Sequence, residues 1–411
     1  MANSSFADVS LGDIADFRNG KAISPEKYTS GGKHPVFGSN GQIACSDEVL
    51  YPEPAIVIGR VGAYCGCVHY VPRASWVTDN AIVALPRVGN DIRYLFYLLG
   101  SLELQRTAIG SAQPLMTQGG LKVVRTKAPP LAEQKAIAAV LGALDDKIEL
   151  NRRMNATLEA MARALFQSWF VDFDPVRAKL DGRPPAALDP ATAALFPSSF
   201  QDSPIGNIPN GWEAVELCQI ANVIDCLHAK KPERCEAGQL YLQLNNIRDD
   251  GLIDITDSFF VSAEDYQKWT SRMEAVAGDC VITNVGRVGA VGQIPEGVKA
   301  ALGRNITGIR CKAEFPFPTF LIECLVSESM REEIRLKTDS GTILDALNVK
   351  SIPKLRFARP TREIGARFEE LTRPIRRRME QNISESRTLA TLRDTLLPKL
   401  LNGELQTTIT P

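Results

Sequence analysis

The chain has 411 residues, of which 44% are hydrophobic and 23% are charged. This length suggests two or three domains, and the composition supplies enough apolar side chains for ordinary cores, which excludes wholesale disorder and fibrous structure. The 47 basic and 48 acidic side chains give a formal net charge of −1, which argues against a protein that holds nucleic acid by bulk charge alone.

The N-terminal region, residues 1–130, mixes strand and helix patterns. Short apolar runs at residues 55–58 and 81–85 are bounded by Gly, Pro and Asn, which is typical of strands joined by turns. Residues 93–106 have a helical pattern. We therefore predict a small α+β domain for this region.

A long helix is predicted for residues 131–172, because apolar residues step through it by four and three as a heptad seam. The residues expected to pair on this seam are Leu141, Leu144, Ile148, Asn151, Asn155 and Leu158. Residues 361–403 repeat the pattern more weakly, with Ile375, Met379, Asn382, Leu389 and Leu396 as the expected pairing residues. Helices of about 40 residues are on the order of 60 Å long. Since this exceeds a compact core, the two helices are expected to pair as a rod.

Polar residues interrupt both seams near their middles. Asn151 and Asn155 lie there in the first helix, and Asn382 and Ser386 in the second. One interpretation is a locally hydrated seam. The other is that the four side chains meet and fix the register of the helices at some cost in stability. The sequence leaves both interpretations open.

The segment that follows the first helix, residues 173–211, is rich in Pro, Ala, Ser and Gly. This composition predicts a connector between larger parts of the chain.

Residues 212–360 repeat the first module. The phrase GRVGA at residues 59–63 returns at 286–290, and LGDIA at 11–15 is echoed by LCQIA at 217–221. Asn80 lines up with Asn305, a helical stretch follows at 319–337, and the order of these features is the same in both copies. Two copies of one module therefore predict a pseudo-twofold arrangement. A short tail, 404–411, ends the chain.

The cysteines and histidines do not form a recognisable site. The nine cysteines are an odd number without paired CxxC spacing, which favours buried reduced thiols over a disulfide framework or a zinc ribbon. The three histidines are scattered. No bound metal is expected.

Signatures of catalysis and of membrane insertion are missing from the sequence. It contains no GxxxxGK[ST], HExxH, GxSxG or EF-hand motif, and no NPPY-like turn of an amino-group methyltransferase. The start of the chain does not have the pattern of a signal peptide, and no run reaches the ~18 apolar residues of a membrane span. We therefore expect a non-catalytic, cytoplasmic protein.

Three phrases point to a known family. They are PPLAEQKAIAAVLGALDDKIELNRRMNATLEAMARALFQSWFVDF after the first module, LFPSSFQDSPIGNIPNGWEAVEL before the second, and the closing LRDTLLPKLLNGEL. With two such modules and helices, the chain resembles the specificity subunit of type I restriction-modification systems over essentially its whole length. The modules themselves match only in outline.

The resemblance implies an α+β fold of two tandem target recognition domains, each followed by a long helix. The helices would pair as an antiparallel coiled coil with pseudo-twofold symmetry. Each domain would read one half of a bipartite, asymmetric DNA site, and the helices would set the non-specific spacer. The implied boundaries are 1–130 for domain 1, 131–172 for helix 1, 173–211 for the connector, 212–360 for domain 2, 361–403 for helix 2 and 404–411 for the tail.

The resemblance also implies partners. These are double-stranded DNA, two modification (methyltransferase) subunits that carry S-adenosylmethionine, and restriction (translocase and nuclease) subunits that use ATP and Mg²⁺. The chain itself would bind no cofactor and no membrane. The partner-facing residues expected on the first helix are Gln134, Lys135, Asp145, Lys147, Arg152 and Arg153. The alternative is a stand-alone coiled-coil DNA-binding repressor or architectural protein.

Candidate DNA-binding residues are loop positions with donor or acceptor side chains, because such groups read base edges and hold phosphates. In the first module they are Lys21, Lys33, His34, Ser39, Asn40, Arg60, Tyr64, Ser111 and Gln113. In the second they are Lys230, Lys231, Gln243, Asn245, Asn246, Arg248, Arg287, Arg304 and Thr342. The phrase QLNNIR at 243–248 is the densest group, although it also fits a polar turn. Arg60 and Arg287 share the GRVG phrase, so a structural or phosphate role is favoured over base reading.

The charge is unevenly distributed along the chain. Residues 212–353 have a formal charge of −6, and residues 354–411 have one of +5. Since non-specific affinity increases with the number of phosphates neutralised, the isolated chain is expected to bind DNA weakly, with partner subunits supplying positive surface.

Overall fold

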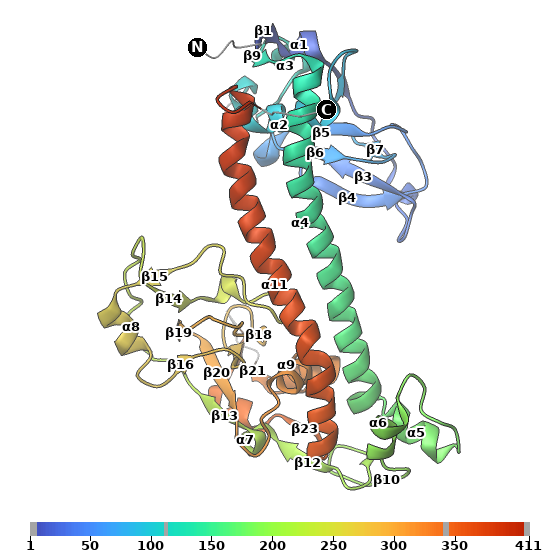
Figure 1. The fold of residues 1–411 in the computed structure, drawn as a ribbon, viewed down its shortest axis with the longest axis vertical. Coiled ribbons are helices and arrows are strands. Elements are labelled where there is room, and N and C mark those ends of the chain that lie inside the picture. The colour runs from blue at the N-terminus through green and yellow to red at the C-terminus, as the bar shows by residue number, and fades with distance from the viewer. Residues whose placement is uncertain (1–5, 111–113, 340–344, 407–411) are drawn as a thin grey trace. The chain divides into compact units, whose positions relative to one another are not determined.

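The computed structural model describes residues 6–110, 114–339 and 345–406. They form two compact units: Met1–Glu149 with Thr388–Pro411, and Leu150–Arg387. Two long helices, α4 (Leu131–Phe166) and α11 (Arg362–Leu401), contribute to both units (Figure 1). Among the described residues, no helix has the length and apolar character needed to cross a membrane.

The module in the first unit is built from three small sheets. Its strands are β1 (Ala7–Ser10), β2 (Ala15–Asn19), β3 (His34–Gly38), β4 (Gly41–Ser46), β5 (Ala55–Gly59), β6 (Val68–Val71), β7 (Trp76–Val77), β8 (Ala81–Pro86) and β9 (Arg125–Ala128). The order β2-β8-β5-β6 forms an antiparallel sheet, β4-β3-β7 forms a second sheet in which β3 and β7 are parallel, and β1 pairs with β9. Strand β5 is a continuous apolar run because it is buried along its whole length.

Short helices cover the sheets of this module. They are α1 (Leu11–Ile14), α2 (Ile92–Ser101) and α3 (Gln118–Lys122), with 3-10 turns at Pro25–Lys27, Gly62–Tyr64 and Leu104–Thr107. Helix α2 begins at Ile92 because the Asp91 carboxylate accepts a hydrogen bond from Tyr94 N at 2.9 Å. Its apolar face packs on β5 and β8 in one core, which also takes in Leu141 of α4 and Leu400 of α11.

The module in the second unit repeats this plan. Its strands are β12 (Glu213–Glu216), β13 (Ala221–Ile224), β14 (Gln239–Leu242), β15 (Phe260–Val261), β16 (Glu274–Ala275), β17 (Cys280–Thr283), β18 (Val291–Gln293), β19 (Ala300–Leu302), β20 (Ile306–Cys311), β21 (Thr338–Asp339), β22 (Ala346–Leu347) and β23 (Arg356–Arg359). Its helices are α7 (Leu217–Ile220), α8 (Ala263–Trp269), α9 (Pro318–Val326) and α10 (Glu328–Leu336), with 3-10 turns at Leu244–Asn246 and Val349–Lys354.

Strand pairing shows that the two modules are copies. The sheet β13-β20-β17-β18 corresponds to β2-β8-β5-β6, and β12 with β23 corresponds to β1 with β9. Within β15-β14-β19-β16, strands β14 and β19 are parallel, as β3 and β7 are in the first module. The prediction of two α+β modules, each followed by a long helix, is therefore confirmed. The second module adds β16, and its pair of β21 and β22 corresponds to the antiparallel bridge between Ile109 and Leu115 in the first module.

The helical stretches predicted inside the modules are each broken in two. Residues 93–106 form α2 and a separate 3-10 turn, and residues 319–337 form α9 and α10. The second break occurs at Ser327, whose side chain caps α10 by accepting from Met330 N at 3.3 Å while its backbone ends α9.

The predicted connector, residues 173–211, is structured and contributes to the core of the second unit. It contains α5 (Asp174–Leu180), α6 (Pro190–Leu195), β10 (Phe200–Gln201) and β11 (Ile208–Pro209). Phe173 and Phe196 are buried with Trp169 and Trp212 in an aromatic cluster, where Trp169 and Phe196 lie 5.0 Å apart between ring centroids. Removing one such ring costs about 3–5 kcal/mol, so this segment is a structural element of the second unit.

Candidate nucleic-acid interface

In the first module, several loops meet where β5 ends. Arg60 N donates to Asn80 O at 3.0 Å, and the Ser39 hydroxyl donates to the same carbonyl. From the other side, Met116 N donates to Arg60 O at 2.9 Å. Only glycine fits at position 59, because an added Cβ would lie 2.7 Å from Ser39 O. We call the residues that meet here, 38–41, 59–66, 78–81 and 114–116, the first loop cluster.

The second module has the same junction where β17 ends. Asn284 N donates to Asn305 O at 2.8 Å, and Leu347 N donates to Asn284 O at 2.8 Å. Asn284 is buried, and its side chain also accepts from Thr307 Oγ1 at 2.9 Å and donates to Leu347 O at 3.2 Å. We call residues 284–290, 303–306 and 345–347 the second loop cluster.

These hydrogen bonds correct the predicted equivalence of Arg60 and Arg287. Arg60 and Asn284 make the corresponding backbone hydrogen bonds, to Asn80 and Asn305, so Asn284 occupies the position of Arg60. The shared GRVG letters are displaced by three residues in the fold. Arg287 lies further along its turn, and the two arginines do not occupy a common position.

The two arginines have different surroundings. Arg60 is half-buried, and its Nη1 donates to Asp79 O at 3.2 Å across the first loop cluster. Arg287 is exposed, and its Nη1 donates to Ile247 O at 2.6 Å while its Nη2 pairs with Asp249. Both side chains therefore brace neighbouring loops and still present guanidinium surface at the junction.

The other first-module candidates do not all lie in the first loop cluster. Asn40 and Tyr64 are exposed in the first loop cluster, beside Ser39 and Arg60. Lys33 and His34 lie at the opposite end of β3, so the structure does not bring them to the cluster. Lys21 is exposed beside β7, where its carbonyl accepts from Trp76 Nε1 at 2.8 Å. Ser111 and Gln113 lie outside the described residues.

In the second module, the QLNNIR phrase is mainly a turn. Asn246 is only 2% exposed, where its side chain accepts from Gln243 N and donates to Asp254 O, each at 2.8 Å. Arg248 is exposed but is held bidentately by Asp250. Asn246 is therefore a structural residue, whereas the exposed Asn245 remains available for contact.

The remaining second-module candidates are basic and exposed. Lys231 lies 4.3 Å from the centroid of the Phe259 ring, and its Nζ donates to Gln243 Oε1 at 2.7 Å. Lys230 is exposed beside it, and Arg304 is exposed next to Asn305 in the second loop cluster. Thr342 lies outside the described residues.

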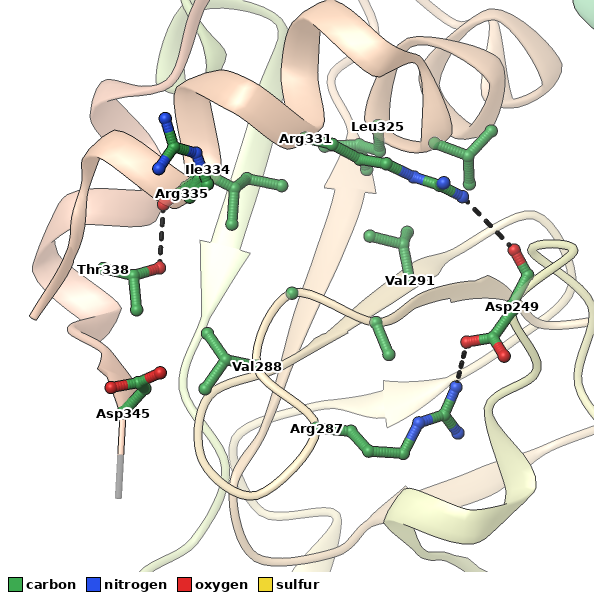
Figure 2. A pocket seen from close by; sticks show the side chains of 13 residues that line it. Asp249, Arg287, Val288, Val291, Leu325, Arg331, Ile334, Arg335, Thr338 and Asp345 are labelled. Atoms are coloured by element: carbon green, nitrogen blue, oxygen red, sulfur yellow. Dashed lines mark hydrogen bonds and ion pairs between the residues drawn. The ribbon is translucent and has the colours of Figure 1, made fainter. Parts of the chain in front are cut away.

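A groove that the sequence interpretation missed lies beside the second loop cluster. It has a volume of about 660 Å³ and is lined by the turn that carries Arg287 and by α10. Figure 2 shows Arg287 and Arg331 pointing toward Asp249 from two sides of the groove. The signal in the sequence was the i, i+4 spacing of Arg331 and Arg335, which places them on one face of a helix.

Within each unit, the two long helices run antiparallel. In the first unit, Arg393 Nη1 pairs with Asp145 Oδ1 at 2.7 Å. In the second unit, Asn151 Nδ2 donates to Ser386 Oγ at 3.2 Å, and Asn382 Nδ2 donates to Asn155 Oδ1 at 2.7 Å. The four polar residues therefore meet, as one of the two interpretations predicted.

The predicted pairing residues differ in burial. Leu141, Asn151, Met379 and Asn382 are buried, whereas the remaining ones, Leu144, Ile148, Asn155, Leu158, Ile375, Leu389 and Leu396, are half-buried. Gln134 was predicted to lie on the exposed, partner-facing side of the first helix, and this prediction is wrong. Gln134 is 2% exposed and accepts from Asp91 N at 2.9 Å while donating to Pro129 O at 2.9 Å.

A buried ion pair attaches α11 to the second module. Arg376 Nη1 lies 3.6 Å from Glu323 Oε1 on α9, and both side chains are 6% exposed. Arg376 also donates to Gly251 O. Burial raises the pKa of Glu323 above its usual value, although the charge of Arg376 opposes this shift.

Among the described residues, one trio has potential metal ligands close together: Asp225, Cys226 and His228, with ligand atoms within 4.8 Å. His228 Nε2 lies 2.7 Å from Asp225 Oδ2, and Arg272 lies 3.6 Å from the same carboxylate. Burial raises the pKa of the Cys226 thiol, which disfavours the thiolate that a metal needs. The chemistry of this trio fits an ion pair better than a metal site.

Comparison with known proteins finds similar proteins within one family. The family described as type I restriction modification DNA specificity domain matches residues 3–160. The type I restriction enzyme HindI specificity subunit of Haemophilus influenzae is 27% identical over 377 residues, covering 80% of this chain and 79% of that protein. The MjaIX specificity subunit of Methanocaldococcus jannaschii is 25% identical over 333 residues, covering 78% of this chain and 71% of that protein.

A solved structure has the same fold. The S subunit of a type I restriction-modification system from M. genitalium superposes with a TM-score of 0.66 at 17% sequence identity, covering 97% of each chain. At this identity the likeness concerns the fold, and it extends over both modules and both helices.

Proposed function

Because the chain belongs to the specificity subunits of type I restriction-modification systems, we propose that it is the DNA sequence-recognition subunit of such a complex. Each module reads one half of a bipartite, asymmetric site. The observation that carries this proposal is the repeated junction, in which loops gather at the end of β5 in one module and of β17 in the other.

The loop clusters suit the reading of DNA. The first presents Asn40, Tyr64 and Arg60, and the second presents Arg287 and Arg304. Amide and guanidinium groups at the ends of rigid strands can donate to base edges or phosphates. Since the exposed residues differ between the modules while the backbone junction is the same, two different half-sites can be read from one scaffold.

The long helices have a separate role in this proposal. They set the spacer between the half-sites and dock two modification subunits, and restriction subunits join the assembly. The chain is non-catalytic, S-adenosylmethionine is bound by the modification subunits, and ATP with Mg²⁺ is used by the restriction subunits. The stand-alone repressor is not favoured, because the relatives that match about four fifths of this chain are specificity subunits.

Methylation mapping tests the proposal. The full chain is co-expressed with its host's type I modification subunit, and modified bases are located by methylation-sensitive sequencing. We expect one bipartite motif, which is lost when the chain is omitted. Modification without sequence preference, or specific DNA binding by the chain without any partner, would contradict the proposal.

A matched pair of variants tests the role of one module. Asn40→Ala removes an exposed amide of the first loop cluster and is expected to relax one half of the motif only. Asn210→Ala removes an exposed amide from a turn of the connector and should leave the motif unchanged. If the two variants gave the same motif, Asn40 would not read a base.

A further inference from the structure

We propose that Arg287 and Arg331 form a phosphate clamp for the DNA backbone, and that the Asp249 carboxylate occupies the Arg287 side of this clamp until DNA replaces it. This inference rests on the proposed function and names a contact that serves it. All three residues belong to the second unit and line the groove in Figure 2.

The geometry of the two arginines carries the proposal. Arg287 Nη2 pairs with Asp249 Oδ1, and Arg331 Nη2 donates to the backbone carbonyl of Asp249 at 3.4 Å. Two guanidinium groups on separate elements thus converge on one acidic residue. A phosphate offers the same acceptor chemistry as a carboxylate, with more oxygens, and two arginines can bind it together.

The carboxylate is easy to displace. The Asp249 side chain is 93% exposed and that of Arg287 is 43% exposed. Exposed ion pairs contribute little to stability, so replacing the Asp249 carboxylate by a phosphate costs little free energy. Arg287 is also held in place by its bond to Ile247 O, so the guanidinium stays oriented after the exchange.

The groove between the turn that carries Arg287 and α10 has room for a segment of DNA backbone. Gly289 has a φ of +75°, and a Cβ at this position would lie 2.9 Å from Ile334 Cγ2 of α10. A glycine here therefore allows the turn to pack against the helix. The volume of about 660 Å³ exceeds that of one phosphate group, and apolar side chains such as Val288 and Leu325 line the floor. This combination fits a stretch of sugar-phosphate backbone.

In the described part of the first module, a shorter element stands where the second module has α10. Helix α2 is followed by the four-residue 3-10 turn Leu104–Thr107, where the second module has the nine-residue α10. Arg106 in that turn pairs with Glu103 at 2.6 Å. The clamp therefore belongs to one half-site only, and the two modules hold the DNA backbone differently.

The test measures binding of a duplex DNA of random sequence to the full chain with its modification subunit. Each phosphate contact contributes about −0.9 to the slope of log affinity against log salt. Arg331→Ala should therefore flatten the slope by about one, so that its deficit relative to the wild type shrinks about threefold between about 50 and 200 mM salt. The motif found by methylation mapping should not change.

Two further variants make the test specific. Asp249→Asn removes the competing carboxylate and should tighten binding to random DNA, whereas a purely structural role for Asp249 predicts no gain. Arg335→Ala removes the same charge from the same helix, but the Arg335 guanidinium makes two bonds to Glu332, at 2.6 and 2.8 Å, whereas Arg287 makes one bond to the Asp249 carboxylate, so a phosphate would have to break two bonds to take Arg335. It should leave the slope near that of the wild type.

The outcomes separate the two proposals. The clamp is wrong if Arg331→Ala keeps the wild-type slope, if Arg335→Ala has an equal effect, or if Arg331→Ala changes the modified motif. If the wild-type complex itself modifies DNA without any sequence preference, the proposed function fails, whatever the salt slopes show.

Discussion

Asn151, Asn155, Asn382 and Ser386 form a polar layer between the long helices. This layer predicts a measurable coupling between the effects of Asn155 and Asn382 substitutions on stability. Asn382 is 1% exposed, and its Nδ2 donates to Asn155 Oδ1 at 2.7 Å. Asn155→Leu removes the acceptor and leaves a buried amide without this partner, which costs about 1–3 kcal/mol. For a unit of this size, each 1 kcal/mol corresponds to about 2–4 °C in the midpoint of thermal unfolding.

The double variant separates this mechanism from a simple packing effect. Asn155→Leu with Asn382→Leu removes both polar groups, so it should recover most of the loss, with a coupling of about 1–3 kcal/mol between the two positions. Gln381→Leu, at the exposed neighbouring position, should change stability by less than about 0.5 kcal/mol. Differential scanning calorimetry measures the wild type, both single variants Asn155→Leu and Asn382→Leu, the double variant and the Gln381→Leu control, because the coupling is the difference between the loss in the double variant and the sum of the two single losses. Additive losses in the double variant would refute the coupling.

The same double variant tests the register. Without the polar layer, the helices can slip by one heptad, which is about 10 Å of helix or about three base pairs of DNA. Methylation mapping should then find a second spacer length beside the original. If the double variant modifies sites of a single spacer length, the asparagines do not set the register.

Three other predictions concern the second module. Burial raises the pKa of Glu323, so the folded chain binds the proton of this carboxyl group more tightly than the unfolded chain does. The stability that this group contributes therefore falls as the pH rises from about 4.5 through the raised pKa. Glu323→Gln should weaken this pH dependence in urea unfolding measured from pH 4 to 8. Asn284→Ala removes the side-chain bonds to Thr307 and Leu347 and should cost about 1–3 kcal/mol, seen as faster proteolysis of the second loop cluster. Arg287→Ala should weaken binding to all DNA sequences alike in a competition assay, and relaxed specificity at one base pair would contradict its phosphate role.

The long helices and the repeat could be predicted because both follow from regular patterns. A heptad seam specifies a helix from its own residues, as Leu141 and Met379 illustrate, since both are buried where the pattern places apolar residues. The meeting of the polar residues required one more fact, the register of the helix pair. That register depends on contacts between distant segments, such as Asn151 with Ser386, which no local pattern encodes.

The loops could be predicted only in part, because turns of different length can share letters. Strand β5 ends at Gly59, which is the first residue of the first GRVG phrase, whereas β17 ends at Thr283, three residues before the second GRVG phrase begins at Gly286. Alignment by GRVG therefore paired Arg60 with Arg287, whereas the backbone pairs Arg60 with Asn284. The composition of residues 173–211 predicted a connector, because Pro and Ala content does not show which other residues a segment packs against. The segment is part of the core because it packs with Trp212 and its neighbours.

The acidic charge of the second module and its capacity to hold DNA are separate properties. Arg248 pairs with Asp250, and Arg310 with Asp279, so part of the charge is balanced locally. The carboxylate of Asp279 is 5% exposed and cannot be exchanged for a phosphate without breaking the fold, whereas that of Asp249 can. Net charge governs the long-range approach of DNA, while the exposure of each pair decides which arginines are available on contact. An acidic module can therefore carry a phosphate clamp and still depend on partner subunits to attract DNA.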